Sequence, residues 1–332
     1  MATTISCSTK FLLLSLLVSA VPLALLVSLE RSISTAHVYQ YKSNGWFRES
    51  CKWDEENRRF LVSYFEGGVG EVSVSGDRRS GGVLEERTVV IDADVAAGNS
   101  SLGIVIDRPR NRLLVVYSDV VWNRFAALGS YDLNTWRRIF LTTLTPRPGE
   151  KEKALADDVA VDVDGNAYVG DAKSNKIWKV GVNGELLSVI RSPLFKHDKW
   201  YKNMVGLNGI VYHPDGYLLV IHTSSGTLYK IDPKSETVKA VKVVRGSLAF
   251  GDGLELLSPL ELVVAAAAPS ASLVESKDGW ETAAVVGRFS GPLHRLATAA
   301  TIKEGKVLVS HLVGLGFPNK KHVIVEAMFD KS

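Results

Sequence analysis

Cysteine is nearly absent from this chain. Only Cys7 and Cys51 occur among 332 residues, and Cys7 precedes an apolar segment that we expect to lie outside the folded domain. The domain therefore has no second cysteine with which to form an intramolecular disulfide, whatever its compartment. A reactive thiol needs a neighbouring base, and no such base is evident beside Cys51, so we predict that Cys51 is a small core residue.

An excess of charge of one sign is also missing. The 39 Lys and Arg residues nearly balance the 36 Asp and Glu residues, and they form no block. This composition gives no indication of nucleic acid or of an anionic membrane surface as a partner. Three enzyme motifs are absent as well: G-x-S-x-G, H-E-x-x-H and G-x-x-x-x-G-K. The seven histidines show no metal-ligand spacing, and His213 and His222, at a turn and a strand end, are expected at the surface.

One long apolar run is present near the N-terminus. Phe11–Leu29 contains no charged residue, follows Lys10 and ends before Glu30. Its length lies between that of a signal peptide and that of a membrane span, so residues 1–36 are predicted to be either a cleaved signal peptide or an uncleaved signal-anchor helix. Candidate cleavage sites follow Ala20 and Ala36. Either way the protein enters the secretory pathway, and it would be secreted, vacuolar or membrane-anchored. The membrane is then a partner only through an uncleaved leader. The sequon at Asn99 is a candidate glycosylation site in a surface connection.

Residues 37–330 contain a repeated unit in which an apolar run, a turn and a second apolar run follow one another. The second runs are centred about 44 to 54 residues apart, the length of a four-stranded propeller blade. We therefore predict an all-β fold, a six-bladed β-propeller preceded by the apolar leader. The repeats begin at Glu49, Leu102, Asp157, Asn208, Asp252 and Ala297.

The strands of this propeller are predicted from runs of Val, Ile, Leu and Tyr between turn residues. In the fourth unit we expect strands at 208–212, 217–222 and 227–231, and an outer strand at 237–244. The last unit has three strands, 297–302, 306–312 and 322–328, and His37–Tyr41 is expected to supply the fourth and close the ring. Two long connections, 143–156 and 191–207, are expected on the face where the inner strands begin. They are either solvated loops or a lid over a pocket, with Trp200 and Tyr201 as substrate-binding walls.

Inner strands of a propeller line its central channel, so residues at equivalent starting positions converge on the axis. Four of the six units place an oxygen-bearing side chain there, whereas Leu102 contributes none. Three buried carboxylates would repel one another, and a divalent cation relieves that repulsion. Oxygen ligands that include an amide favour Ca²⁺, with Mg²⁺ or Mn²⁺ as alternatives. The predicted metal ligands are Glu49, Asp157, Asn208 and Asp252.

Three segments resemble a known family. RESCKWDEENRRFLVS, LNGIVYHPDGYLLV and GDGLELLSPLELVVA are similar to the senescence-marker-protein/gluconolactonase-like propellers, calcium-dependent lactonases and organophosphate hydrolases. The resemblance covers about residues 45–325 and implies that Glu49, Asn208 and Asp252 hold the metal. A third-unit motif that faces the site reads Asp157-Asp158-Val159 here, which makes Asp158 a candidate substrate contact. The family's substrate-binding Arg is replaced by Leu155. The leader resembles that of strictosidine-synthase-like and paraoxonase-like propellers of the secretory pathway.

The function predicted from these features is Ca²⁺-dependent hydrolysis of a small lactone, ester or phosphotriester, with Asp252, by the resemblance, as the base that accepts a proton from water. Two alternatives remain. A strictosidine-synthase-like lyase would need a catalytic Glu near the last unit, where only Glu304 and Glu326 occur. A non-catalytic binding propeller would hold the ion for structural reasons alone. The sequence does not indicate an oligomeric state.

Overall fold

The structure, a computed structural model, describes residue 22 and residues 24–30, 38–74, 82–95, 97–145 and 152–331. The chain divides into two units, Met1–Ala36 and His37–Ser332. In the first unit residues 24–30 are helical. No helix among the described residues is long and apolar enough to cross a membrane. Most of Phe11–Leu29, Cys7 and both candidate cleavage sites lie outside the described residues.

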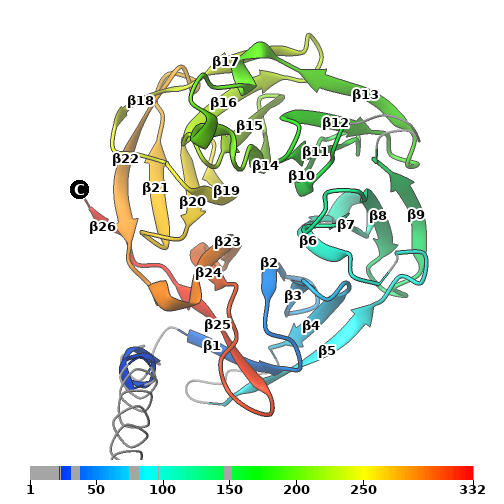
Figure 1. The fold of residues 1–332 in the computed structure, drawn as a ribbon, viewed down its shortest axis with the longest axis vertical. Coiled ribbons are helices and arrows are strands. Elements are labelled where there is room, and N and C mark those ends of the chain that lie inside the picture. Colours follow the sequence, from blue (N-terminus) through cyan, green and yellow to red (C-terminus); the bar gives the residue numbers. More distant parts are fainter. Residues whose placement is uncertain are drawn as a thin grey trace, which may run out of the picture. The chain divides into compact units, whose positions relative to one another are not determined.

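The second unit consists of β-strands arranged in a ring (Figure 1), and among its described residues four short 3-10 helices lie in the connections. Three sheets have four consecutive strands each, joined in chain order. They are β6 to β9 (Ser100–Asp107, Arg112–Ser118, Ala126–Asp132 and Arg138–Thr143), β10 to β13 (Ala156–Val161, Ala167–Asp171, Lys176–Val180 and Leu186–Arg191) and β14 to β17 (Leu207–His213, Tyr217–His222, Thr227–Asp232 and Thr237–Ala240).

The other two sheets are larger. The six-stranded sheet contains β19 (Gly251–Ser258), β20 (Glu261–Ala266), β21 (Ala271–Glu275), β22 (Thr282–Phe289), β18 (Lys242–Arg245) and β26 (Asp330–Lys331). The eight-stranded sheet contains β2 (Arg48–Asp54), β3 (Arg59–Tyr64), β4 (Val69–Ser73), β5 (Leu84–Val90), β1 (Val38–Ser43), β25 (Lys320–Glu326), β24 (Lys306–His311) and β23 (Ala297–Lys303). In Figure 1 the strands nearest the centre of the ring are β2, β6, β10, β14, β19 and β23.

The N-terminal strand closes the ring as predicted. β1 pairs antiparallel with β25, from Val38 opposite Val325 to Ser43 opposite Lys320. His37, the first residue of the predicted closing strand, lies outside the described residues. The other edge of β1 pairs parallel with β5 at Tyr41 and Lys42 only. Both edges of the closing strand are therefore hydrogen-bonded, and no long free edge is left at the closure.

Two predictions about strands and histidines are wrong. The outer strand expected at 237–244 is broken: β17 pairs with β16, whereas β18 pairs parallel with β22 of the next sheet. His213 and His222 are buried, not at the surface. The His213 ring stacks on Tyr217 at 4.2 Å between centroids and its Nε2 bonds to the Pro259 carbonyl, so contacts from distant segments cover this turn.

The hydrophobic core lies between adjacent sheets. One cluster joins Leu114 and Leu128 of one sheet to Val169 and Trp178 of the next, and the other clusters repeat this arrangement around the ring. Each sheet thus buries its faces against its neighbours. Cys51 is a free, buried cysteine, as predicted, and burial raises the pKa of its thiol.

Candidate functional site

Every inner strand has a β-bulge near its start, and these bulges surround the centre of the ring. The antiparallel pairing of each inner strand with its neighbour shifts register between two residues near the strand's start. Such bulges leave the intervening residues unpaired and redirect their side chains. The residues inside the shifts include Glu49, Leu102, Asp157, Asn208 and Asp252, which are repeat positions that the sequence places at the axis. In the last inner strand the residue inside the shift is Thr298, one residue after the predicted position Ala297.

These bulges surround a small cavity. The volume of this cavity that is open to the centre of a water-sized sphere is about 10 Å³, which is enough for one water molecule or ion. Its lining includes Glu49, Asp157, Asp158, Asn208 and Thr298. Thr298 donates a hydrogen bond of 2.5 Å from its hydroxyl to the Glu49 carbonyl, which joins β23 to β2.

Glu49 is the least compensated acid at the centre. Its Oε2 is buried and has no hydrogen-bond partner among the described residues. Burial raises the pKa of the Glu49 carboxyl well above its ordinary value, and the nearby charges of Asp252, Asp157 and Asp158 raise it further. A buried acid without a partner is costly whenever it is ionised.

Two other acids at the centre are perturbed in the same direction. Burial, followed by the charges of Asp252 and Asp158, raises the pKa of Asp157 well above its ordinary value. Burial and the charge of Asp158 raise the pKa of Asp252 to about 7, although a hydrogen bond from Asn208 opposes this shift. The sequence-predicted ligands therefore interact with one another, and their negative charges are not neutralised locally.

A second group of charges lies further along the inner strands. Lys52 pairs with Glu255 across the channel and also reaches the Ala300 carbonyl at 3.4 Å. Burial acts to lower the pKa of Lys52, but the charges of Glu255 and Asp158 outweigh it and the pKa is raised. Asp158 accepts hydrogen bonds from the backbone N–H groups of Val159 and Ile210, at 2.8 and 3.3 Å. Burial nevertheless raises the pKa of Asp158 to about 6.

The donor set fits a hard cation in its chemistry, because it consists of carboxylate and amide oxygens. The orphaned Glu49 oxygen and the mutual repulsion of the acids fit a cation too. As the side chains stand, no three Asp, Glu, His or Cys residues in the described part of the chain are grouped closely enough to hold one metal ion. The centre thus has the chemistry of an ion site without a closed shell of acidic ligands.

Several residues of the centre were not predicted from the sequence. Gly103, Gly209 and Gly253 each follow a ring position, and a Cβ at each would lie 2.3, 2.2 and 2.6 Å from Asp158 Oδ1, the Asp252 carbonyl and the Thr298 carbonyl. Glycine therefore permits the inner strands to approach this closely. The sequence did contain a signal for this close approach of the strands, because these glycines recur at one repeat position. Lys52 and Glu255 likewise follow Glu49 and Asp252 at one shared spacing.

Not every predicted site residue lines the small cavity, and Asp252 is among those absent from its lining. Trp200 and Tyr201 are 77% and 46% exposed on the connection before β14 and are absent from its lining. Asp158 lines this cavity and a wider one of about 310 Å³ further along the channel. Asn99 immediately precedes β6 and is only 8% exposed, although a surface position was predicted. The substrate-binding and glycosylation assignments stay predictions.

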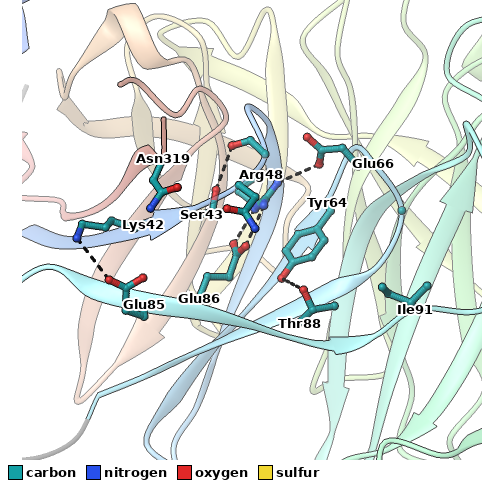
Figure 2. A pocket seen from close by; sticks show the side chains of 13 residues that line it. Lys42, Ser43, Arg48, Tyr64, Glu66, Glu85, Glu86, Thr88, Ile91 and Asn319 are labelled. Atoms are coloured by element: carbon teal, nitrogen blue, oxygen red, sulfur yellow. Dashed lines mark hydrogen bonds and ion pairs between the residues drawn. The ribbon is translucent and has the colours of Figure 1, made fainter. Parts of the chain in front are cut away.

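A larger pocket lies at the closure of the ring, away from the axis. Its volume is about 490 Å³, and Figure 2 shows Arg48 at its wall between Glu66 and Glu86. Arg48 binds Glu86 through two hydrogen bonds of 2.7 and 2.9 Å and covers the Tyr64 ring at 3.9 Å. These partners occupy most of the N–H donors of Arg48, so this side chain serves to join β2, β3 and β5.

Comparison with known proteins supports the architecture. The chain matches the major Malassezia sympodialis allergen Mala s 1 with a TM-score of 0.66 and 16% identity, over 88% of this chain and 96% of that one. It matches a luciferin-regenerating enzyme with a TM-score of 0.56 and 13% identity, over 89% and 97% of the two chains. Both are propellers. The fold is a β-propeller.

These propellers establish the fold alone, because the identities are low. No family model matches the chain. No curated protein matches it either. The resemblance to the senescence-marker-protein/gluconolactonase-like family is therefore not confirmed by sequence comparison.

Proposed function

We propose that this chain is a six-bladed propeller whose centre binds Ca²⁺ and hydrolyses a lactone, ester or phosphotriester. The blade count follows if the eight-stranded sheet is divided at the short pairing of β1 with β5, which involves two residue pairs. β2 to β5 then form the first blade, and β23, β24, β25 and β1 form the last. Mg²⁺ and Mn²⁺ are alternatives to Ca²⁺ at such a site.

The observation that carries the proposal is the uncompensated burial of Glu49. Its Oε2 has no partner among the described residues, and Asp252 and Asp157 raise its pKa in addition to burial. A bound cation would offset both the desolvation and the repulsion. Glu49, Asn208 and Asp252 would hold the ion, with Asp157 completing the set.

In the proposed reaction, Asp252 accepts a proton from the attacking water. Without metal the pKa of Asp252 is about 7, and a bound cation would favour the ionised carboxylate that a general base needs. Asn208 orients that carboxyl through the hydrogen bond that lowers its pKa. When bound, the cation supplies polarisation of the carbonyl or phosphoryl oxygen. Asp158 is held by backbone N–H groups near Lys52, in a position to contact the polar end of a substrate.

The preferred substrate is proposed to be more apolar than a sugar lactone. Leu155 stands where the resembling family has its substrate-binding Arg, and its side chain cannot bond to hydroxyl groups. We expect higher kcat/KM on aryl esters and alkyl lactones than on gluconolactone. The opposite preference would show that another residue, such as Lys196 or Lys199, supplies the contact.

The test combines calcium calorimetry with turnover on a panel of lactones, aryl esters and phosphotriesters. Wild type should bind Ca²⁺ and turn over at least one class, whereas Glu49→Gln and Asn208→Ala should weaken Ca²⁺ binding. Asp198→Asn, which removes an exposed acid on the connection before β14, is the matched control and should change neither. Unchanged Ca²⁺ affinity in both ring variants would place the ion elsewhere and refute the proposal.

The two alternatives predict different results. Calcium binding without turnover on any substrate would favour a binding propeller with a structural ion. The lyase alternative needs a catalytic Glu near the axis, and neither candidate fits that role. The Glu304 side chain is 53% exposed and pairs with Lys303, and Glu326 pairs with Lys306. Neither residue lines the axial cavity.

A further inference from the structure

The exposed aromatic side chains are distributed unevenly over the propeller. Among the described residues, those with a largely exposed ring lie in connections before β2, before β14 and before β19, between β7 and β8, and between β24 and β25. They are Trp46, Phe47, Trp122, Trp200, Tyr201, Phe250 and Phe317.

All of these connections lie on one face of the ring. In each sheet the inner strand begins at that face. Because consecutive strands are antiparallel, the second strand and the outermost strand both end there. Connections into an inner strand, or from a second strand to a third, must therefore lie there. On the opposite face the exposed large apolar residues in the described parts of the hairpin turns are Val163 and Leu260, which are aliphatic.

One sector of this aromatic face is also basic. It consists of the connections between β7 and β8, between β9 and β10, between β11 and β12, and between β13 and β14. Among the described residues of these connections there are three acids. Asp119 accepts hydrogen bonds from the backbone of its own turn, Glu152 pairs with Lys176 and Arg191, and Asp198 is the third. The described basic residues are Arg124, Lys153, Lys173, Lys196, Lys199 and Lys202.

The cations and the aromatic rings of this sector are close together. The Arg124 guanidinium lies 5.5 Å from the Trp122 ring centroid, and the Lys199 ammonium lies 6.0 Å from that of Tyr201. Trp200 meets Tyr201 edge to face at 6.2 Å, and Met204 beside them is 62% exposed. Indole and phenol rings beside Lys and Arg are the side chains that favour the interface between lipid headgroups and acyl chains.

We propose that this face docks on a lipid bilayer that carries anionic headgroups. The apolar rings would enter the interface, and the basic sector would face the negative surface potential. The charge complementarity selects an anionic bilayer over a neutral apolar partner. The proposal rests only on described residues of the propeller and does not depend on the leader or on the proposed hydrolysis.

The test uses the full chain with vesicles of phosphatidylcholine and phosphatidylserine whose acyl chains are brominated, and measures quenching of tryptophan emission. Wild type should be quenched. Trp122→Phe/Trp200→Phe should be quenched at least about twofold less, because Trp122 and Trp200 are the most exposed indoles at 60% and 77%. Any contribution of the leader is common to all variants.

Two further variants separate docking from non-specific adsorption. Val163→Trp, placed in the Trp122→Phe/Trp200→Phe background, adds an exposed reporter on the opposite face and should add no quenching. Lys196→Glu/Lys199→Glu keeps every indole and should lose most of the quenching, as should wild type on pure phosphatidylcholine. Equal quenching of the Val163→Trp reporter, quenching that ignores phosphatidylserine, or none in wild type would refute the proposal. The last result would favour a protein partner at this face.

Discussion

Glu49 shows at the scale of one residue that the centre of the propeller contains a buried acid whose charge is not compensated. Its Oε2 makes no hydrogen bond with the described residues, whereas the neighbouring Asp158 has two backbone donors. The two acids line the same small cavity and yet differ in how their charge is stabilised. Protons and the proposed cation would then compete for Glu49 and Asp252.

This competition predicts a pH dependence of stability. The pKa of Asp252 is about 7 in the folded protein, and that of Glu49 is also raised. The folded state therefore retains protons that the unfolded state releases above about pH 4. Without metal, the free energy of unfolding should fall as pH rises from about 4 to about 7, by up to ~1.4 kcal/mol per pH unit for each such acid.

Chemical denaturation between these pH values, with and without Ca²⁺, measures the effect. Added Ca²⁺ should flatten the slope, because it favours the ionised acids. Asp252→Asn removes one titrating group and should reduce the slope in metal-free protein. A stability that rises over this interval would contradict the assignment.

Lys52 provides a second residue-scale prediction. It pairs with Glu255 with both side chains about one-fifth exposed, and it also faces Asp158. Lys52→Met leaves two acids without their cation and should lower the free energy of unfolding by about 3 kcal/mol, the lower end of the range for a broken buried pair. Lys239→Met, which breaks an exposed pair with Glu281, is the control and should cost less than about 1 kcal/mol. Equal effects would show that Lys52 is not needed to neutralise the channel.

At the scale of the element, β1 is the strand on which closure depends. It hydrogen-bonds to β25 along its whole length and to β5 at two positions. Tyr41 on this strand is 1% exposed and stacks on His322 at 5.3 Å. The strand thus contributes both a ladder and a buried ring.

Removing the strand should therefore destabilise the whole propeller. A chain that starts at Asn44 should melt at a much lower temperature than one that starts at His37, because the edge of β25 is exposed. Tyr41→Ala should lower the free energy of unfolding by about 3 kcal/mol, as for other large buried rings. The exposed change Lys42→Ala is the control. An unchanged melting temperature in the Asn44 chain would show that β25 tolerates a free edge.

At the scale of the whole molecule, the fate of the leader is the open question that experiment can settle. If Phe11–Leu29 is an uncleaved anchor, the protein should resist carbonate extraction and keep its N-terminus. A mature N-terminus near His37 would show cleavage instead. The propeller should be equally stable in both cases, because the described core clusters all lie between Tyr39 and Phe329.

The sequence by itself determined the repeat, most strand positions, the closing strand and the equivalence of Glu49, Asp157, Asn208 and Asp252. These features depend on local signals, such as apolar runs bounded by Asp-Gly and Asn-Gly turns, and local signals can be read along the chain. The recurring glycines after the ring positions were a readable signal too, but their meaning depends on how closely the strands approach.

Only the tertiary structure decided the rest. The burial of His213 and His222 and the pairing of Lys52 with Glu255 arise between segments that are not neighbours in sequence, whereas the register shift in each inner strand arises in its pairing with the next strand of the chain. The same holds for charge: the balanced total over the chain gives no sign of the basic sector around Trp122 and Trp200. That sector exists because the direction of the inner strands brings distant connections onto one face, and a sum over the sequence cannot contain that information.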